Sequence, residues 1–296
     1  MQKGIIEKLS GFATEQTINL SSKSGAWKLT VPLAEKIAQV LFVKSADPIK
    51  YGPLRERKDK VCIASNLVRS AFKAYEQGSP NVRKRLIDVL LSNLTAPYSN
   101  KPEVVSFKEK HGICPPGFLT ISPFGGCNLK CRGCYASSAP CDLPSLSADT
   151  FQWVIDQKRE HWGSWFTVVS GGEPFLWRDK EVDLIEIAFR NPDQYFLVYT
   201  NGTLIDKRTA ERLAEAGNIT LAISVEGFEK ETDYRRGKGT FERILKAFEN
   251  LRNNGVPFGI STTAVPENAE LLISDEMIEF FFDEQGALYQ WLFQYM

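Results

Sequence analysis

Residues 194–225, QYFLVYTNGTLIDKRTAERLAEAGNITLAISV, contain two apolar runs separated by one helical pattern. The runs at 194–200 and 219–225 are almost continuously apolar, which is typical of strands that are buried on both faces. Between them, residues 206–216 repeat their apolar positions at helical spacing. A strand, a helix and a second strand in this order predict a βα unit with parallel strands.

The same alternation extends on both sides of this stretch. Strands are predicted at residues 118–123, 165–170, 194–200, 219–225, 258–265 and 288–296. Helices are predicted between them at residues 147–159, 180–190, 206–216, 240–254 and 274–283. Five βα units and a sixth strand predict an α/β fold, a partial (βα)6-type TIM-like barrel. In such a barrel the chemistry is expected in the loops that follow the strands.

The first third of the chain has a different pattern. Residues 1–94 are mainly helical by their apolar spacing, with one short strand predicted at 26–31. A helix is expected to begin at Pro80, because Ser79 is a favourable N-cap and proline suits the first helical turn. Residues 95–117 contain four prolines and predict a linker. We therefore expect an N-terminal helical region of unknown role, a linker, and a barrel domain at 118–296.

Composition excludes several classes of protein. The 296 residues include 36 Lys and Arg and 36 Asp and Glu, so no basic excess indicates a nucleic-acid partner. No apolar run is long enough to span a membrane, and the first residues lack the apolar core of a secretory signal. A cytoplasmic location is therefore expected. Because the sequence stops inside an apolar strand, we also expect that it is truncated at its C-terminus.

Three of the six cysteines lie together in CNLKCRGC, directly after the first barrel strand. Cys127, Cys131 and Cys134 have the spacing C-x3-C-x2-C, and thiolates so close together suit an iron–sulfur cluster or zinc. A structural zinc site or a closed electron-transfer cluster takes four ligands, and neither Cys141 nor His111 is well placed to be the fourth. A zinc-binding, non-catalytic barrel and a closed-cluster electron-transfer protein remain alternatives at this point.

This loop resembles the defining motif of the radical S-adenosylmethionine (radical SAM) superfamily. The resemblance implies that Cys127, Cys131 and Cys134 hold a [4Fe–4S] cluster whose open iron binds S-adenosylmethionine. It further implies reductive cleavage of S-adenosylmethionine to a 5′-deoxyadenosyl radical, which removes hydrogen from a substrate. A low-potential reductant of the flavodoxin or ferredoxin type is the implied partner.

Two later strand ends resemble segments of the same family. SGGEP at 170–174 resembles its GGE motif, which implies that Gly171, Gly172 and Glu173 bind the methionine amino group. Glycines also let backbone approach a ligand closely, and a carboxylate suits an ammonium. TNG at 200–202 resembles segments that place an asparagine on the ribose, which implies this contact for Asn201.

A third strand end resembles the family's carboxylate-binding elements. SVEG at 224–227 and RRGKGTF at 235–241 resemble S-x-D-G and R-x-G-x-G-x-F. The resemblance implies that Ser224 and Arg236 bind the carboxylate of S-adenosylmethionine. This chain has Glu226 where relatives usually have aspartate, so the role of that acid is unassigned. It also has Gly133 where many relatives have an aromatic residue, with Tyr135 following the third cysteine instead, so the adenine contact is unassigned.

The resemblance is closest to the branch whose members carry a C-terminal SPASM domain and modify peptides, proteins and some small molecules. It implies a radical SAM enzyme acting on an unidentified substrate, with a peptide or protein as a candidate. The other three cysteines, Cys62, Cys114 and Cys141, are expected to be ordinary small residues. No catalytic acid or base is assigned.

Overall fold

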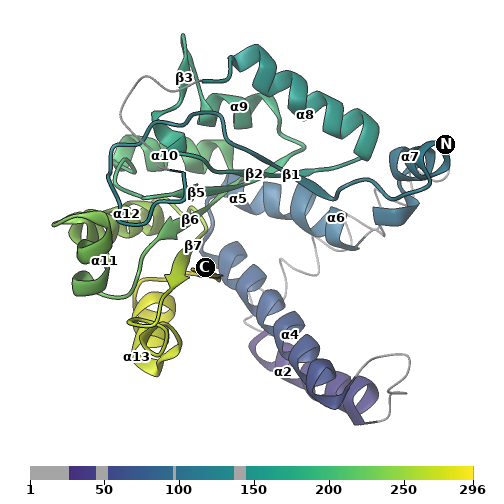
Figure 1. The fold of residues 1–296 in the computed structure, drawn as a ribbon. Helices are drawn as coiled ribbons and strands as arrows, with labels where there is room; N and C mark the ends of the chain where they lie inside the picture. Colours follow the sequence, from purple (N-terminus) through teal and green to yellow (C-terminus); the bar gives the residue numbers. More distant parts are fainter. Residues whose placement is uncertain (1–26, 45–52, 96–97, 137–144, 296) are drawn as a thin grey trace. The chain divides into compact units, whose positions relative to one another are not determined.

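The computed structural model describes residues 27–44, 53–95, 98–136 and 145–295 (Figure 1). The chain divides into two compact units, residues 1–77 and 78–296. No helix among the described residues is long and apolar enough to cross a bilayer.

The described part of the first unit is helical. α2 (Trp27–Ala38) continues as the π-helical segment η1 (Gln39–Lys44), and α4 (Leu54–Gln77) packs against α2. The strand predicted at 26–31 is wrong, since residues 27–31 form the first turns of α2. Trp27 and Val31 are alternating positions, but they are also one helical turn apart. Six residues were therefore too few to distinguish the two periods.

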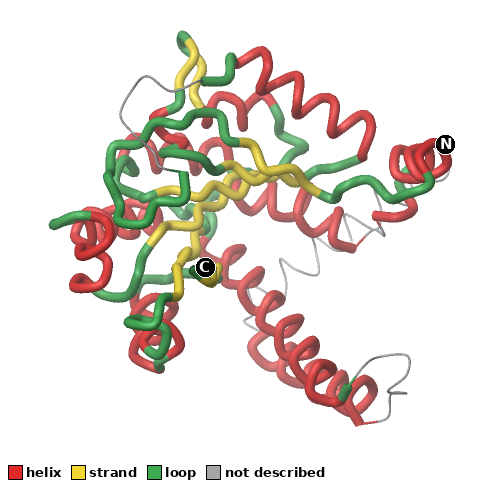
Figure 2. The backbone as a smooth tube through the Cα atoms, in the orientation of Figure 1, coloured by secondary structure: helices red, strands yellow, loops and turns green. Residues whose placement is uncertain are grey.

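The second unit contains one six-stranded parallel sheet. Its strands lie in the spatial order β1-β2-β5-β6-β7-β8, the same as their order along the chain. Their bounds are β1 (Phe118–Ile121), β2 (Phe166–Val169), β5 (Tyr195–Thr200), β6 (Ile219–Ser224), β7 (Phe258–Ala264) and β8 (Gln290–Gln294). The sheet curls into a half-barrel, which confirms the predicted partial TIM-like barrel (Figures 1 and 2).

Helices cover the outer face of this sheet. They are α8 (Ala148–Trp162), α9 (Leu184–Arg190), α10 (Lys207–Ala216), α12 (Thr240–Asn253) and α13 (Asp275–Ile278), the last continuing as η6 (Glu279–Glu284). α11 (Glu229–Arg236) lies at the carboxyl end of the strands, where Arg235 contacts Arg132 of the loop after β1. A short 3-10 turn, η5 (Leu271–Ile273), precedes α13. Apolar side chains from the helices, such as Phe151, Leu213 and Phe248, are fully buried against the sheet in one large core. Because all six strands are parallel, the loops that follow them lie at one end of the barrel.

The inner face of the sheet is lined differently. Val168, Leu197 and Ala222 form a small buried cluster with Tyr199 and other partly buried aromatic residues. Towards the carboxyl ends of the strands this face becomes polar, where Ser224 of β6 pairs in register with β7. The polar end is the one from which the predicted site loops emerge.

The structure differs from the sequence prediction in two segments, the one before α9 and the one that forms α11. The helix predicted at 180–190 begins only at Leu184, because the Asp183 side chain caps it by accepting from Glu186 N at 2.9 Å. The preceding residues form the 3-10 turn η4 (Pro174–Leu176) and a hairpin of β3 (Arg178–Asp179) and β4 (Val182–Asp183). α11 was not predicted, since its sequence, EKETDYRR, has no apolar period.

The predicted linker at 95–117 contains a helix, α7 (Pro102–His111). The prolines in this segment predict a linker because proline interrupts helices, but Pro102 lies in the first helical turn, where its missing N–H costs nothing. Gly112 ends the helix in the left-handed conformation at φ 73°. Residues 95–117 are therefore not a structureless connection.

The helix predicted to begin at Pro80 does so. Ser79 Oγ accepts from Val82 N at 3.3 Å and donates to Ala214 O at 3.0 Å, which fixes the start of α5 (Pro80–Arg85) on the end of α10. The chain continues as η2 (Leu86–Leu91), α6 (Ser92–Thr95) and η3 (Tyr98–Asn100). These helices belong to the larger unit, so the structure divides the chain after Gln77 and not near residue 94.

Candidate functional site

The three clustered cysteines lie on the loop that follows β1. Cys127, Cys131 and Cys134 are all half-buried and are not in disulfides. The loop after β2 holds the start of this cysteine loop by backbone bonds. Gly172 N donates to Phe124 O at 3.0 Å, and Glu173 N donates to Gly126 O at 2.8 Å.

Both glycines of the GGE segment are required by this close approach. A Cβ on Gly172 would lie 2.0 Å from Gly126 O, and Gly171 has φ +115° and would place a Cβ 2.2 Å from Ser122 Oγ. The sequence predicted that these glycines let the backbone approach a ligand. The structure shows that they let it approach the cysteine loop.

Glu173 joins the ends of two neighbouring strands. Its fully buried carboxylate accepts from Thr200 Oγ1 at 2.7 Å, Asn201 N at 2.8 Å and Phe175 N at 3.2 Å. Burial raises the pKa of Glu173, while these three hydrogen bonds oppose the rise. All three partners are protein groups, so the contact with an ammonium group remains a prediction.

Asn201 lies against the middle of the cysteine loop. Its Nδ2 donates to Asn128 Oδ1 at 2.8 Å and lies 3.7 Å from Cys127 Sγ, and its Oδ1 accepts from Thr203 N at 2.9 Å. Asn128 Nδ2 in turn donates to Thr203 Oγ1 at 2.8 Å. Asn201 is thus beside the first cysteine, and its contact with a ribose remains a prediction.

The end of the cysteine loop is held by a charged group that the sequence did not predict. Arg235 Nε donates to Arg132 O at 3.1 Å, and Arg132 N donates to Arg235 O at 2.8 Å. Glu226, whose side chain is 3% exposed, accepts from Arg235 Nη1 at 3.0 Å and from Arg236 Nη2. The pair RR in RRGKG was the available signal, but only the second arginine was singled out.

Ser224 and Arg236 lie at the same end of the barrel. Ser224 is the last residue of β6 and is half-buried. The Arg236 side chain is 12% exposed, and its Nε is buried without a hydrogen-bond partner in the described part of the chain. Since buried donors are normally satisfied, this N–H is available to an acceptor such as a carboxylate oxygen.

Two of the thiols are affected by burial, and one of them also by two nearby guanidinium groups. Burial raises the pKa of Cys127 and Cys131, while Arg236 and then Arg235 oppose the rise at Cys131. Any metal must therefore displace protons, and the two guanidinium groups favour thiolates. No three His, Cys, Asp or Glu side chains of the described ranges converge on one metal ion. A four-iron cluster does not require convergence, because each thiolate binds a different iron.

The alternative of a zinc-binding barrel requires a fourth ligand near the loop. Its candidate fourth ligands were His111 and Cys141. His111 is described and belongs to no such group of ligands, whereas Cys141 lies outside the described residues.

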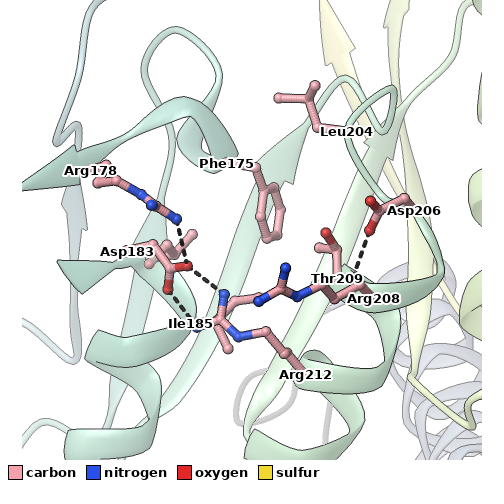
Figure 3. A pocket seen from close by; sticks show the side chains of 10 residues that line it. Phe175, Arg178, Asp183, Ile185, Leu204, Asp206, Arg208, Thr209 and Arg212 are labelled. Carbon is pink, nitrogen blue, oxygen red and sulfur yellow. Dashed lines mark hydrogen bonds and ion pairs between the residues drawn. The ribbon is translucent and has the colours of Figure 1, made fainter. Parts of the chain in front are cut away.

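A separate cavity of about 310 Å³ lies beside η4 and α10 (Figure 3). Phe175 forms one wall, and Asp183 faces Arg212 Nη2 at 3.0 Å and Arg178 Nη2 at 3.8 Å. Asp206 caps α10 by accepting from Thr209 N at 2.7 Å. The cavity contains none of the predicted site residues, and its carboxylates are already engaged by protein groups.

A half-barrel with three cysteines outside disulfides after its first strand, and glycine, asparagine and arginine groups after the next ones, is the arrangement of a radical SAM core. The model of the Radical SAM superfamily matches residues 121–274, just over half of the chain. The chain therefore belongs to the radical SAM superfamily, whose members are enzymes that use a [4Fe–4S] cluster and S-adenosylmethionine.

Known relatives match between about half and two thirds of the chain. The AdoMet-dependent heme synthase of Methanosarcina barkeri is 37% identical over 162 residues, 52% of this chain and 44% of the relative. Mycofactocin maturase MftC of Mycolicibacterium smegmatis is 31% identical over 173 residues, 58% and 43% respectively. Streptococcus suis SuiB, solved with S-adenosylmethionine, has the same fold with a TM-score of 0.55 at 23% identity, covering 66% of this chain and 44% of SuiB. The chain spans less than half the length of each of these relatives.

Proposed function

We propose that this chain is the core of a radical SAM enzyme in which Cys127, Cys131 and Cys134 are the protein ligands of a [4Fe–4S] cluster. One observation carries the proposal: three half-buried cysteines, none of them in a disulfide, lie on one loop that is held by residues after β2, after β5 and at the end of α11. Three ligands leave one iron of a four-iron cluster free to bind a small molecule.

The surrounding residues fit S-adenosylmethionine in this position. When bound, the cluster would supply the electron that cleaves S-adenosylmethionine to a 5′-deoxyadenosyl radical, which takes hydrogen from the substrate. Arg236 offers an unpartnered buried N–H, and Ser224 offers a hydroxyl, to the carboxylate. Gly171 and Gly172 bring backbone to the methionine amino group, and Glu173 fixes that backbone by its bonds to the end of β5.

The substrate and reductant are further parts of the proposal. We take a peptide or protein as the substrate, as supported by the maturase among the relatives. SuiB has been solved with its precursor peptide SuiA, although a likeness at 23% identity concerns the fold alone. The electron donor is proposed to be a flavodoxin or ferredoxin.

A heme precursor is the second candidate substrate. The relative named AdoMet-dependent heme synthase is 37% identical over its aligned part, more than the maturase at 31%. Incubation of the reconstituted protein with a tetrapyrrole or with a peptide would distinguish the two, because only the true substrate should increase the rate of S-adenosylmethionine cleavage.

The first test is anaerobic reconstitution with iron and sulfide, followed by dithionite and S-adenosylmethionine. The proposal predicts 5′-deoxyadenosine from the wild-type protein and none from Cys127→Ala. The matched control is Cys62→Ala, which removes an exposed thiol in the first unit. Zinc binding in place of iron, or a cluster that binds with no 5′-deoxyadenosine from either protein, would contradict the proposed activity.

A further inference from the structure

Glu226 is a buried carboxylate that connects three elements beside the cysteine loop. It follows β6, its side chain is 3% exposed, and it accepts from both arginines at the end of α11. It also accepts from Thr263 N of β7 at 3.1 Å. Removing one partner of such a buried ionic group leaves the others uncompensated, so these groups depend on one another.

The first arginine is directed at the cysteine loop. Arg235 Nε donates to Arg132 O at 3.1 Å, and its Nη2 lies 3.4 Å from Gly133 O. Arg132 and Gly133 are the two residues between Cys131 and Cys134. One guanidinium group therefore fixes the backbone that sets the spacing of the second and third thiols.

The second arginine is directed elsewhere. Arg236 is also held by Glu226, but its Nε is buried and has no partner in the described part of the chain. A guanidinium group is planar and rigid, so fixing Nη2 on the carboxylate also fixes the direction in which the Nε–H points.

We propose that Glu226 is a positioning residue that sets two functions at once. Through Arg235 it holds the Cys131–Cys134 part of the loop in the geometry that the cluster needs. Through Arg236 it directs a donor at the carboxylate of S-adenosylmethionine. This inference rests on the proposed function.

The same geometry explains a glutamate at this position. Its carboxylate must reach two guanidinium groups of α11 and a backbone N–H of β7. An aspartate is shorter by one carbon–carbon bond, about 1.5 Å, and would lose at least one of these contacts.

The test uses Glu226→Gln, Arg235→Lys and Arg236→Lys in the whole chain, with Glu249→Gln as the matched control. Glu249 is paired with Lys246 on the surface, so its loss should change nothing measured. Four quantities are measured: iron and sulfide per chain after reconstitution, the reduction potential of the cluster, the Kd for S-adenosylmethionine of the loaded protein, and the melting temperature of the metal-free protein.

The two arginine variants are expected to change different quantities. Arg235→Lys should lower iron per chain to half or less and leave the Kd of the loaded fraction within about twofold, because charge is kept but the fork is lost. Arg236→Lys should keep the iron and weaken S-adenosylmethionine binding by about tenfold or more, the usual effect of losing one charge-assisted hydrogen bond. Glu226→Gln should do both and shift the reduction potential.

Two results would overturn the inference. One is a Glu226→Gln protein with wild-type iron content and Kd. The other is that Arg235→Lys and Arg236→Lys each change the iron content and the Kd for S-adenosylmethionine equally, since this would indicate a structural effect only. If Glu226→Gln fails to fold, the two arginine variants still test the inference. A wild-type protein that takes up no iron would instead overturn the proposed function, and this inference with it.

Discussion

Replacing Gly172 by alanine should separate the GGE segment from the cysteine loop. The added Cβ would lie 2.0 Å from Gly126 O and 2.7 Å from Gly125 O, and ordinary contact begins at about 3.4 Å. Both neighbours are backbone atoms, which cannot rotate away as a side chain would. The two segments must therefore move apart by about 1.4 Å, the difference between 3.4 and 2.0 Å.

This displacement is large enough to break the bonds between the segments. Gly172 N donates to Phe124 O at 3.0 Å and Glu173 N donates to Gly126 O at 2.8 Å, so both distances would exceed the range of a hydrogen bond. Two lost bonds cost about 1 kcal/mol each, and overpacking adds about 1–3 kcal/mol. We expect a loss of roughly 3–5 kcal/mol in the free energy of unfolding.

Two measurements check this prediction: urea unfolding of the metal-free protein, and iron per chain after reconstitution. Iron should fall to less than half, because Cys127 follows Gly126 directly and moves with it. The matched control is Gly117→Ala, whose Cβ would have no neighbour within 4 Å. The reasoning is refuted if Gly172→Ala unfolds within about 0.5 kcal/mol of the wild type, as a surface change would, and binds the same iron.

Two other predictions concern a buried base and a ligand. Burial lowers the pKa of Lys158 to about 7, so between pH 7 and 10.5 the unfolded chain binds more protons and stability should rise with pH. Lys158→Met should remove this pH dependence, which is a rise of up to about 1.4 kcal/mol per pH unit in the free energy of unfolding. Urea unfolding at pH 7 and 9 measures the rise, and a rise unchanged from the wild type would exclude Lys158 as its origin. Cys131→Ala should abolish cluster binding while Cys114→Ala, at an exposed thiol, keeps it, and full iron and sulfide in Cys131→Ala would remove that residue from the ligands.

The barrel could be predicted from the sequence because apolar runs alternate with helical patterns from residue 118 onward. The run at 194–200, for example, becomes β5, whose residues are almost all buried. Short segments carried less information. Residues 27–31 form helix although they alternate like a strand, and the polar helix α11 has no apolar period.

The placement of the candidate site residues was predictable where one local motif determines it. The spacing of the cysteines and the Gly171–Gly172 pair are visible along the chain, and the structure places both in one region. Glu226 could not be assigned in this way. Its partners are an arginine nine residues later and the backbone of Thr263, and only the folded path of β6, α11 and β7 brings them together.

The cysteine loop is held at three points by residues that follow three different strands. Its start is bound by the backbone after β2, its middle by Asn201 after β5, and its end by Arg235 between β6 and β7. The spacing of the thiols therefore depends on the curl of the sheet as well as on the loop sequence. The backbone contact at Gly172 cannot yield to an added methyl group, whereas the contact at Glu226 is made by side chains. We therefore expect Gly172 to tolerate no larger residue, and the contact at Glu226 to depend on the reach and the fork geometry of its side chains.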